Sequence, residues 1–175
     1  MSRYRLLPAS DQEAVLRDHC AHARFAWNLA VEQHAHWRPG RANAPGYLEQ
    51  CRQLTQARAE HAWLAAGSQM VQQQALRDFA QGMAAFFDPA NPARRPSWRK
   101  ACRDEGFRVV AVRPGQLRRL SRNTGEVWVP KAGWVRFRWS RAVPGRGEIV
   151  QGDDGQGRAM ACCLRRHPLA GSRTR

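Results

Sequence analysis

The spacing of apolar residues changes twice along this 175-residue chain, and that change constrains the fold more than any other feature. Residues 3–7 alternate polar and apolar side chains, which indicates a short strand ending at Pro8. Apolar residues then recur at helical spacing up to about residue 88. Beyond residue 106, short apolar runs alternate with Gly- and Pro-containing turns, as in antiparallel strands. The sequence therefore predicts an α+β fold.

Three helices are predicted after the first strand. A capping box at residues 10–13, in which the side chains of Ser10 and Glu13 bond each other's backbone amides, begins a helix expected over about residues 11–37. The second helix is expected to start at Pro45 and run past residue 60, and the third follows a serine cap. The predicted core stripes are Leu16, Cys20, Ala23, Trp27, Ala30, Val31 and His34, then Leu48, Cys51, Leu54, Trp63 and Leu64, then Leu76, Phe79, Met83, Phe86 and Phe87.

Short strands are predicted in the second half of the chain. They are Phe107–Val112, Gln116–Leu120, Glu126–Val129, Gly133–Ser140 and Glu148–Gln151. In the fourth, strict alternation places Val135, Phe137 and Trp139 on one face and Trp134, Arg136 and Arg138 on the other. Together with the amino-terminal strand they suggest a small open antiparallel barrel, and such barrels bind nucleic acid on a basic, aromatic face. The alternative is an arginine face that serves solubility alone.

Positive charge is concentrated in the same half. Residues 1–88 carry 9 Lys and Arg against 8 Asp and Glu, a net charge of +1, whereas residues 89–175 carry 20 against 6, a net charge of +14. Such a surplus indicates a polyanionic partner, because each neutralised phosphate releases a condensed counterion. Nucleic acid is the predicted partner.

Membrane, disulfide and metal classes receive no support from the sequence. It has no run of 18 uncharged apolar residues and no signal-type segment, so a cytoplasmic protein without membrane contact is expected. The five cysteines form no C-x-x-C pair, and the histidines near Cys20 lack the usual ligand spacing. No metal site and no cofactor are therefore predicted.

Five segments, in order, resemble the amino-terminal part of the TnpB family, the RNA-guided nucleases of insertion sequences, between about residues 3 and 150. The segments are Tyr4–Pro8 with Gln12, Ala23–Asn28, Trp63-Leu64, Gln73–Phe79 with Phe86-Phe87, and Val129–Val135. In that family, the helical block is often labelled a transposase helix-turn-helix domain.

The resemblance implies an OB-like β-barrel, called the wedge domain, that is interrupted after its first strand by a helical recognition module. The expected boundaries are residues 1–9 for the first strand, 10–88 for the three-helix module, 89–105 for a basic Pro-rich connector, 106–164 for the remainder of the barrel and 165–175 for a disordered tail. Both domains would hold structured guide RNA and the duplex DNA motif that flanks the target.

The resemblance also implies that Tyr47, Gln69 and Gln73 face the DNA motif. Gln69, Gln73 and Arg77 share one helical stripe, and glutamine can bond an adenine edge with both its amide atoms. The alternative is that these residues form a solvated flank. Arg24 and Asn28 either pair with phosphate or brace the helices. The residues predicted to contact RNA are Arg94, Arg95, Trp98, Arg99, Lys100, Lys131, Arg136 and Arg138.

No catalytic residue is predicted. The family's chemistry lies in a RuvC-like domain with three metal-binding carboxylates, whereas the acids after Glu148 are only Asp153 and Asp154. The sequence beyond residue 152 is interpreted as the product of a shifted reading frame. The predicted function is nucleic-acid binding without nuclease activity, by a fragment of a TnpB-like protein. The alternatives are a freestanding DNA-binding regulator and a truncated product with no function.

Overall fold

The computed structural model describes residues 2–36, 43–103, 106–112, 114–140, 147–153 and 160–165. The chain divides into two compact units. The sheet unit comprises residues 1–14 and 108–175, and the helical unit comprises residues 15–107. The fold is α+β, as the sequence predicts.

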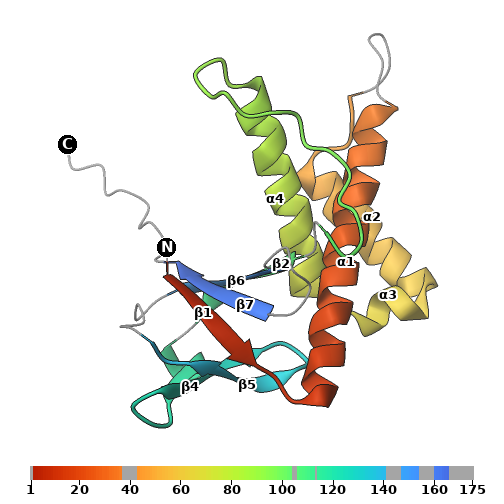
Figure 1. The fold of residues 1–175 in the computed structure, drawn as a ribbon. Coiled ribbons are helices and arrows are strands. Elements are labelled where there is room, and N and C mark those ends of the chain that lie inside the picture. The colour runs from red at the N-terminus through yellow and green to blue at the C-terminus, as the bar shows by residue number, and fades with distance from the viewer. Residues whose placement is uncertain are drawn as a thin grey trace, which may run out of the picture. The chain divides into compact units, whose positions relative to one another are not determined.

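Helices supply the core of the helical unit (Figure 1). They are α1 (Ser10–Ala35), whose first turn lies in the sheet unit, α2 (Tyr47–Glu60), α3 (Ala62–Ala66) and α4 (Gln69–Phe87). The central residues of each predicted stripe are buried, which confirms their helical period. These are Leu16, Cys20, Ala23, Ala30 and Val31 of α1, Leu54 and Leu64 of α2 and α3, and Leu76, Phe79 and Met83 of α4.

The predicted second helix is broken at His61, so the prediction of three helices is wrong. His61 has extended backbone angles, and its carbonyl accepts hydrogen bonds from the amides of Leu64 and Ala65, which start α3. A guanidinium nitrogen of Arg58 donates to the Leu64 carbonyl at 2.8 Å. A long side chain thus satisfies a carbonyl that a continuous helix would have paired within its own backbone.

The ends of the predicted stripes are also wrong. Leu48, Trp63, Phe86 and Phe87 are exposed, and Phe87 exposes 71% of its surface. Leu48 lies in the first turn of α2, Phe86 and Phe87 end α4, and Trp63 lies in the single-turn helix α3. Helix ends have fewer neighbours than helix centres, so an apolar side chain at the right angular position stays uncovered there.

The start of α1 differs from the predicted capping box. Because α1 begins at Ser10, the residue that precedes it is Ala9. The amide of Glu13 donates to the Ala9 carbonyl at 2.8 Å, and the amide of Ala9 donates to Oε1 of Gln12 at 3.1 Å. Gln12 therefore makes the return contact that was expected of Glu13, one residue earlier in the chain.

Seven strands form one sheet in the order β2-β6-β7-β1-β5-β4-β3. The strands are β1 (Ser2–Leu7), β2 (Gly106–Val112), β3 (Leu117–Arg119), β4 (Thr124–Val129), β5 (Gly133–Arg138), β6 (Gly147–Asp153) and β7 (Met160–Arg165). The five strands predicted after residue 106 are present. The sequence analysis missed β7, and the predicted tail is wrong at Arg165, which is paired in β7. Residues 166–175 lie outside the described part of the chain.

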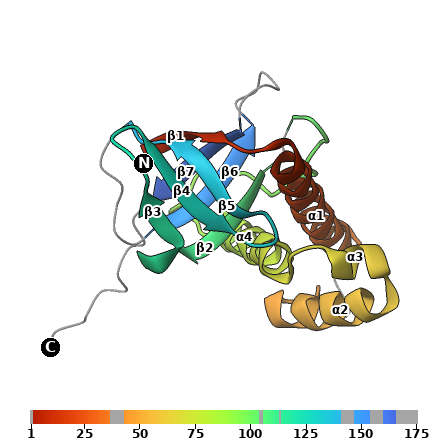
Figure 2. The same ribbon diagram turned by 90° about the horizontal axis from the view of Figure 1, so that it is seen from below.

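Strand β1 joins the two halves of this sheet. Ser2 to Arg5 pair with β7, and Leu6 and Leu7 pair with β5, both antiparallel. The prediction that the amino-terminal strand pairs with strands beyond residue 105 is therefore confirmed. The sheet curves, so that β6 and β7 lie behind the β4–β5 hairpin in Figure 2. Strands β2 and β3 are the ends of the order, so the described sheet is open.

The inner face of β1, β4 and β5 forms the core of the sheet unit. Tyr4, Val127, Val135 and Phe137 are buried, and the rings of Tyr4 and Phe137 meet edge to face at 5.5 Å between centroids. Because strand side chains alternate, Arg136 is exposed on the opposite face. The predicted alternation of β5 is confirmed at these positions.

Candidate nucleic-acid interface

The outward face of β3, β4 and β5 carries a compact set of cationic and aromatic side chains. The pairing register places Arg118 opposite Glu126 and Glu126 opposite Arg136, so these three form one row across the sheet. Trp128 and Trp134 form the next row. We call these five residues, together with Arg138 of β5, the Arg–Trp face. Three arginines against one carboxylate leave it with a net charge of +2.

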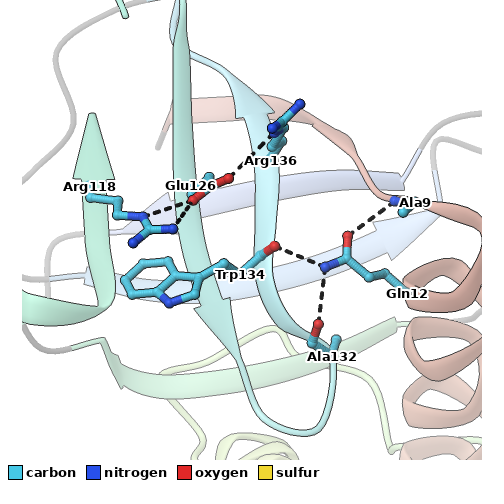
Figure 3. Close-up of polar contacts among 7 residues, drawn as sticks. All are labelled: Ala9, Gln12, Arg118, Glu126, Ala132, Trp134 and Arg136. Atoms are coloured by element: carbon cyan, nitrogen blue, oxygen red, sulfur yellow. Dashed lines mark hydrogen bonds and ion pairs between the residues drawn. The ribbon is translucent and has the colours of Figure 1, made fainter. Parts of the chain in front are cut away.

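Glu126 holds two arginines of the Arg–Trp face (Figure 3). Nε of Arg118 donates to one carboxylate oxygen at 2.8 Å, and Nε of Arg136 contacts the other at 3.4 Å. The hydrogen bonds from Arg118 lower the pKa of the Glu126 carboxyl, burial opposes that shift, and Arg136 adds to it. The carboxylate is therefore ionised at neutral pH and fixes both guanidinium groups on the sheet.

The tryptophan pair lies beside this ion-pair row. The Arg118 guanidinium carbon lies over the Trp134 ring, 4.1 Å from its centroid. Trp128 meets Trp134 at 5.7 Å between centroids with an interplanar angle of 73°. Trp134 is half-buried, whereas Trp128 keeps 39% of its surface exposed.

Gln12 anchors the hairpin that carries this face. Its side-chain amide donates to the carbonyls of Ala132 at 3.1 Å and Trp134 at 2.9 Å (Figure 3). The hairpin turn between them and β4 contains Lys131, which is exposed and adopts a left-handed backbone with φ 64°. The turn therefore holds a cation near the Arg–Trp face on a backbone fixed by the start of α1.

The basic connector is bound to α1 by Asn28 and by Trp27, which is half-buried although the sequence predicts it in the core stripe. Both amide atoms of Asn28 bond the backbone of Arg99, at 2.8 and 3.0 Å, and the Trp27 indole donates to the Ser97 carbonyl at 2.8 Å. The Arg99 guanidinium stacks over Trp27, 3.8 Å from the ring centroid. Asn28 therefore holds the connector on α1, and its predicted pairing with phosphate stays a prediction.

The remaining connector residues differ in their exposure and contacts. Arg95 donates to the carbonyl of His34 at 3.2 Å, near the end of α1. Arg94, Trp98 and Lys100 are exposed. Arg24 is half-buried one turn before the bracing asparagine on α1.

The three residues predicted to face DNA, together with Arg77 of the same predicted stripe, lie on two helices. Gln69 and Arg77 are exposed on α4, and Gln73 between them is half-buried. The Arg77 guanidinium carbon lies 5.3 Å from the centroid of the Tyr47 ring, at the start of α2. Burial is the main cause of a raised pKa of the Tyr47 phenol, so it stays a neutral hydrogen-bond donor at physiological pH.

Sequence reasoning missed Arg118, Glu126 and Trp128. A signal for them was present, since Glu126 is the one acid between residues 106 and 140, a stretch that contains eight basic residues. A single carboxylate in a basic segment is expected to pair with neighbouring cations. Which arginine it meets depends on how the strands align, and the sequence alone does not show that Arg118 lies opposite Glu126. Trp128 follows from the alternation of β4, in which Val127 and Val129 point inward.

Within the described ranges, no cluster of three or more His, Cys, Asp or Glu side chains is placed to hold a metal ion. None of the helices described is long and apolar enough to cross a membrane.

Comparisons with known proteins give two matches. Residues 2–40 match the helix-turn-helix domain of IS605 OrfB proteins. The described part of that match is β1 and α1, a strand followed by one long helix. The chain is also 27% identical over 149 residues to InsQ of Escherichia coli strain K12, a protein assigned as an RNA-guided DNA endonuclease. The alignment spans 82% of this chain and 34% of InsQ, about a third of that protein's length.

Proposed function

Because the chain belongs to the TnpB family of insertion-sequence proteins, we propose that it is a nucleic-acid-binding part of a TnpB-like protein. Its main ligand is structured guide-type RNA, bound by the sheet unit and the basic connector. Its second ligand is the duplex DNA that flanks a target. The residues of this chain bind without cutting.

The observation that carries this proposal is the uneven charge. Residues 89–175 hold a net charge of +14, and the Arg–Trp face exposes Arg136 and Arg138 on a strand whose opposite face is core. Arginines on a rigid strand bind phosphates at low entropic cost, because the backbone that carries them is already ordered. Seven cations of the predicted set lie in this half, namely Arg94, Arg95, Arg99, Lys100, Lys131, Arg136 and Arg138.

The DNA part of the proposal rests on α4. Gln69 and Arg77 present an amide and a guanidinium at two-turn spacing, and Tyr47 lies against Arg77. Amide and guanidinium groups are those that read base edges in a major groove. Residues 1–88 have a net charge of only +1, so the duplex contacts of α4 are expected to be weak without the basic half of the chain.

Absence of cutting is proposed from the chemistry of phosphodiester hydrolysis. Two-metal hydrolysis needs several carboxylates that converge on metals about 4 Å apart. Glu126, the buried carboxylate of the sheet unit, is already held by two arginines. Its charge is thereby neutralised, which makes it a poor metal ligand.

Two alternative functions predict different binding to duplex DNA and to RNA. A freestanding DNA-binding regulator would use α1 to α4 alone on duplex DNA, which their near-neutral charge disfavours. A truncated product without function would bind RNA no better than any basic protein, and its affinity would not depend on the Arg–Trp face.

The test is a fluorescence-anisotropy titration of the full chain with hairpin RNA from the neighbouring insertion-sequence end, and with duplex DNA, at several salt concentrations. Four to seven phosphate contacts predict a slope of log affinity against log salt of roughly −3 to −6 for RNA. Tighter binding to duplex DNA than to RNA would favour the regulator. RNA-dependent cleavage of a matching target in Mg²⁺ would refute binding without cutting.

A further inference from the structure

The Arg–Trp face combines a partly exposed aromatic ring with fixed cations, and this combination goes beyond what phosphate binding requires. Phosphate contacts need only the arginines. Trp128 lies in the row next to Arg118, Glu126 and Arg136 and exposes 39% of its surface. A partly exposed ring beside a row of fixed cations suits a ligand with both a flat apolar face and a negative charge.

From this geometry we propose that Trp128 is a stacking site for an unpaired nucleobase, so that the sheet unit binds single-stranded segments of its RNA. The proposal rests on the proposed function, because it assigns the class of RNA segment that the same face would bind. An unpaired nucleotide offers a π-face to the ring and a phosphate to the neighbouring arginines. A duplex offers phosphates alone, because its bases are stacked on each other.

The structure fixes Trp128 and leaves it accessible. Trp134 meets it edge to face, and Trp134 is in turn held by Arg118, which Glu126 anchors. A Cβ built on Gly133 would lie 3.8 Å from Cζ3 of Trp128, so the ring lies close to the hairpin turn. The exposed ring is therefore preorganised, and stacking a base on it costs little side-chain entropy.

The neighbouring cations select a nucleotide over an uncharged aromatic ligand. Arg138 lies two residues beyond Arg136 on the same outward face of β5 and is exposed. The spacing of alternate residues along a strand, about 6.6 Å, is similar to the distance between successive phosphates of an extended strand. Glu126 already neutralises part of Arg118 and Arg136, and Arg138, which pairs with Thr124 two rows from Trp128, is placed for the phosphate of an adjoining nucleotide.

The experiment compares three ligands at one salt concentration: an oligouridylate of about 15 nucleotides, a sugar-phosphate strand of the same length without bases, and an RNA duplex. Trp128→Ala is expected to weaken oligouridylate binding about 5- to 150-fold, the range for loss of one stacked base. The base-free strand and the duplex should change less than about twofold, because they cannot stack on the ring. Trp63→Ala is the matched control, since Trp63 is an exposed tryptophan of the helical unit.

A second variant protects the test against misfolding. Trp128→Phe keeps an aromatic face and is expected to retain most of the oligouridylate affinity. In the wild-type chain, oligouridylate should quench tryptophan emission more than the base-free strand does, and Trp128→Phe should remove that difference. Equal losses for oligouridylate and the base-free strand in Trp128→Ala, or equal quenching by both in the wild type, would overturn the stacking site.

The outcomes separate this proposal from the proposed function. Salt-dependent binding of hairpin RNA with no effect of Trp128→Ala on oligouridylate would remove the stacking site and leave the function standing. A wild-type chain that binds none of these ligands would overturn both.

Discussion

Replacing Leu6 with alanine tests the most unusual connection in the sheet unit, the pairing of an amino-terminal strand with strands that follow about 130 to 160 residues later. Leu6 is 4% exposed and pairs with Phe137 of β5, whereas its neighbour Leu7 is 49% exposed and points to the other face. Truncating a buried leucine costs about 2–5 kcal/mol, because the transfer energy is lost and a cavity is left. Leu7→Ala should cost less than about 1 kcal/mol, because much of that side chain is already in water.

Hydrogen exchange measured by mass spectrometry reads this difference at the strands themselves. A loss of 2 kcal/mol or more corresponds to an increase of about 30-fold or more in the opening equilibrium of β4 and β5 amides in Leu6→Ala. Leu7→Ala is the control on the same strand, one residue away and facing outward. Equal effects of the two substitutions, or unchanged exchange of β5 in Leu6→Ala, would refute the packing of β1 described here.

Three further predictions follow from single contacts. Because the pKa of Glu126 is lowered, its pairing with Arg118 stabilises the fold fully at pH values above the ordinary glutamate pKa of about 4.3. This stabilisation is lost as the pH falls through the lowered pKa. Glu126→Gln should therefore flatten the acid side of a curve of unfolding free energy against pH. Gly125→Ala would push a Cβ into the rings of Phe137 and Trp139 and should lower the free energy of unfolding of the sheet unit, measured in urea, by about 1–3 kcal/mol. Gly115→Ala is the control, because a Cβ there meets open space. Asn28→Ala removes two hydrogen bonds to the backbone of Arg99. It should speed tryptic cleavage of the connector about fivefold or more, which corresponds to a loss of about 1 kcal/mol in the free energy of local opening. Unchanged cleavage would mean that these hydrogen bonds do not hold the connector.

The features predicted correctly depend on short-range periodicity. Alternation over residues 134–139 places Val135 inside and Arg136 outside without knowledge of any neighbour, and the helical stripe around Ala23 works in the same way. These are cases in which the local pattern and the global fold agree. The pairing of β1 depends instead on distant segments, and its prediction came from the resemblance to a family whose barrel is interrupted after its first strand.

The features missed depend on which distant segments meet. Nothing local distinguishes Phe87 from the buried Phe79 on the same helical stripe, because the difference is where the neighbouring elements end. The row of Arg118, Glu126 and Arg136 arises from the register of three strands, which a single sequence does not specify. Strand β7 was missed because the composition after residue 152 was interpreted as a shifted reading frame.

The interface residues remain predictions of different strength. The positions of Arg136, Arg138 and Lys131 on one hairpin support a shared role for them, whereas Asn28 bonds the backbone of the connector. The most informative residue for the RNA proposal is therefore on β5.

The central claim, that the basic sheet unit holds RNA through its outward strand face, is tested most directly by the salt dependence of hairpin-RNA affinity in a double variant. Arg136→Gln with Arg138→Gln removes two cations of the Arg–Trp face, and Arg17→Gln with Arg52→Gln removes the same charge from exposed positions of the helical unit. If both arginines of β5 contact phosphate, the slope of log affinity against log salt should become shallower by roughly 1.4–1.8 in the first variant and by less than about 0.5 in the second. Equal changes in the two variants would show that only total charge matters, and would contradict the assignment of the RNA interface to this face.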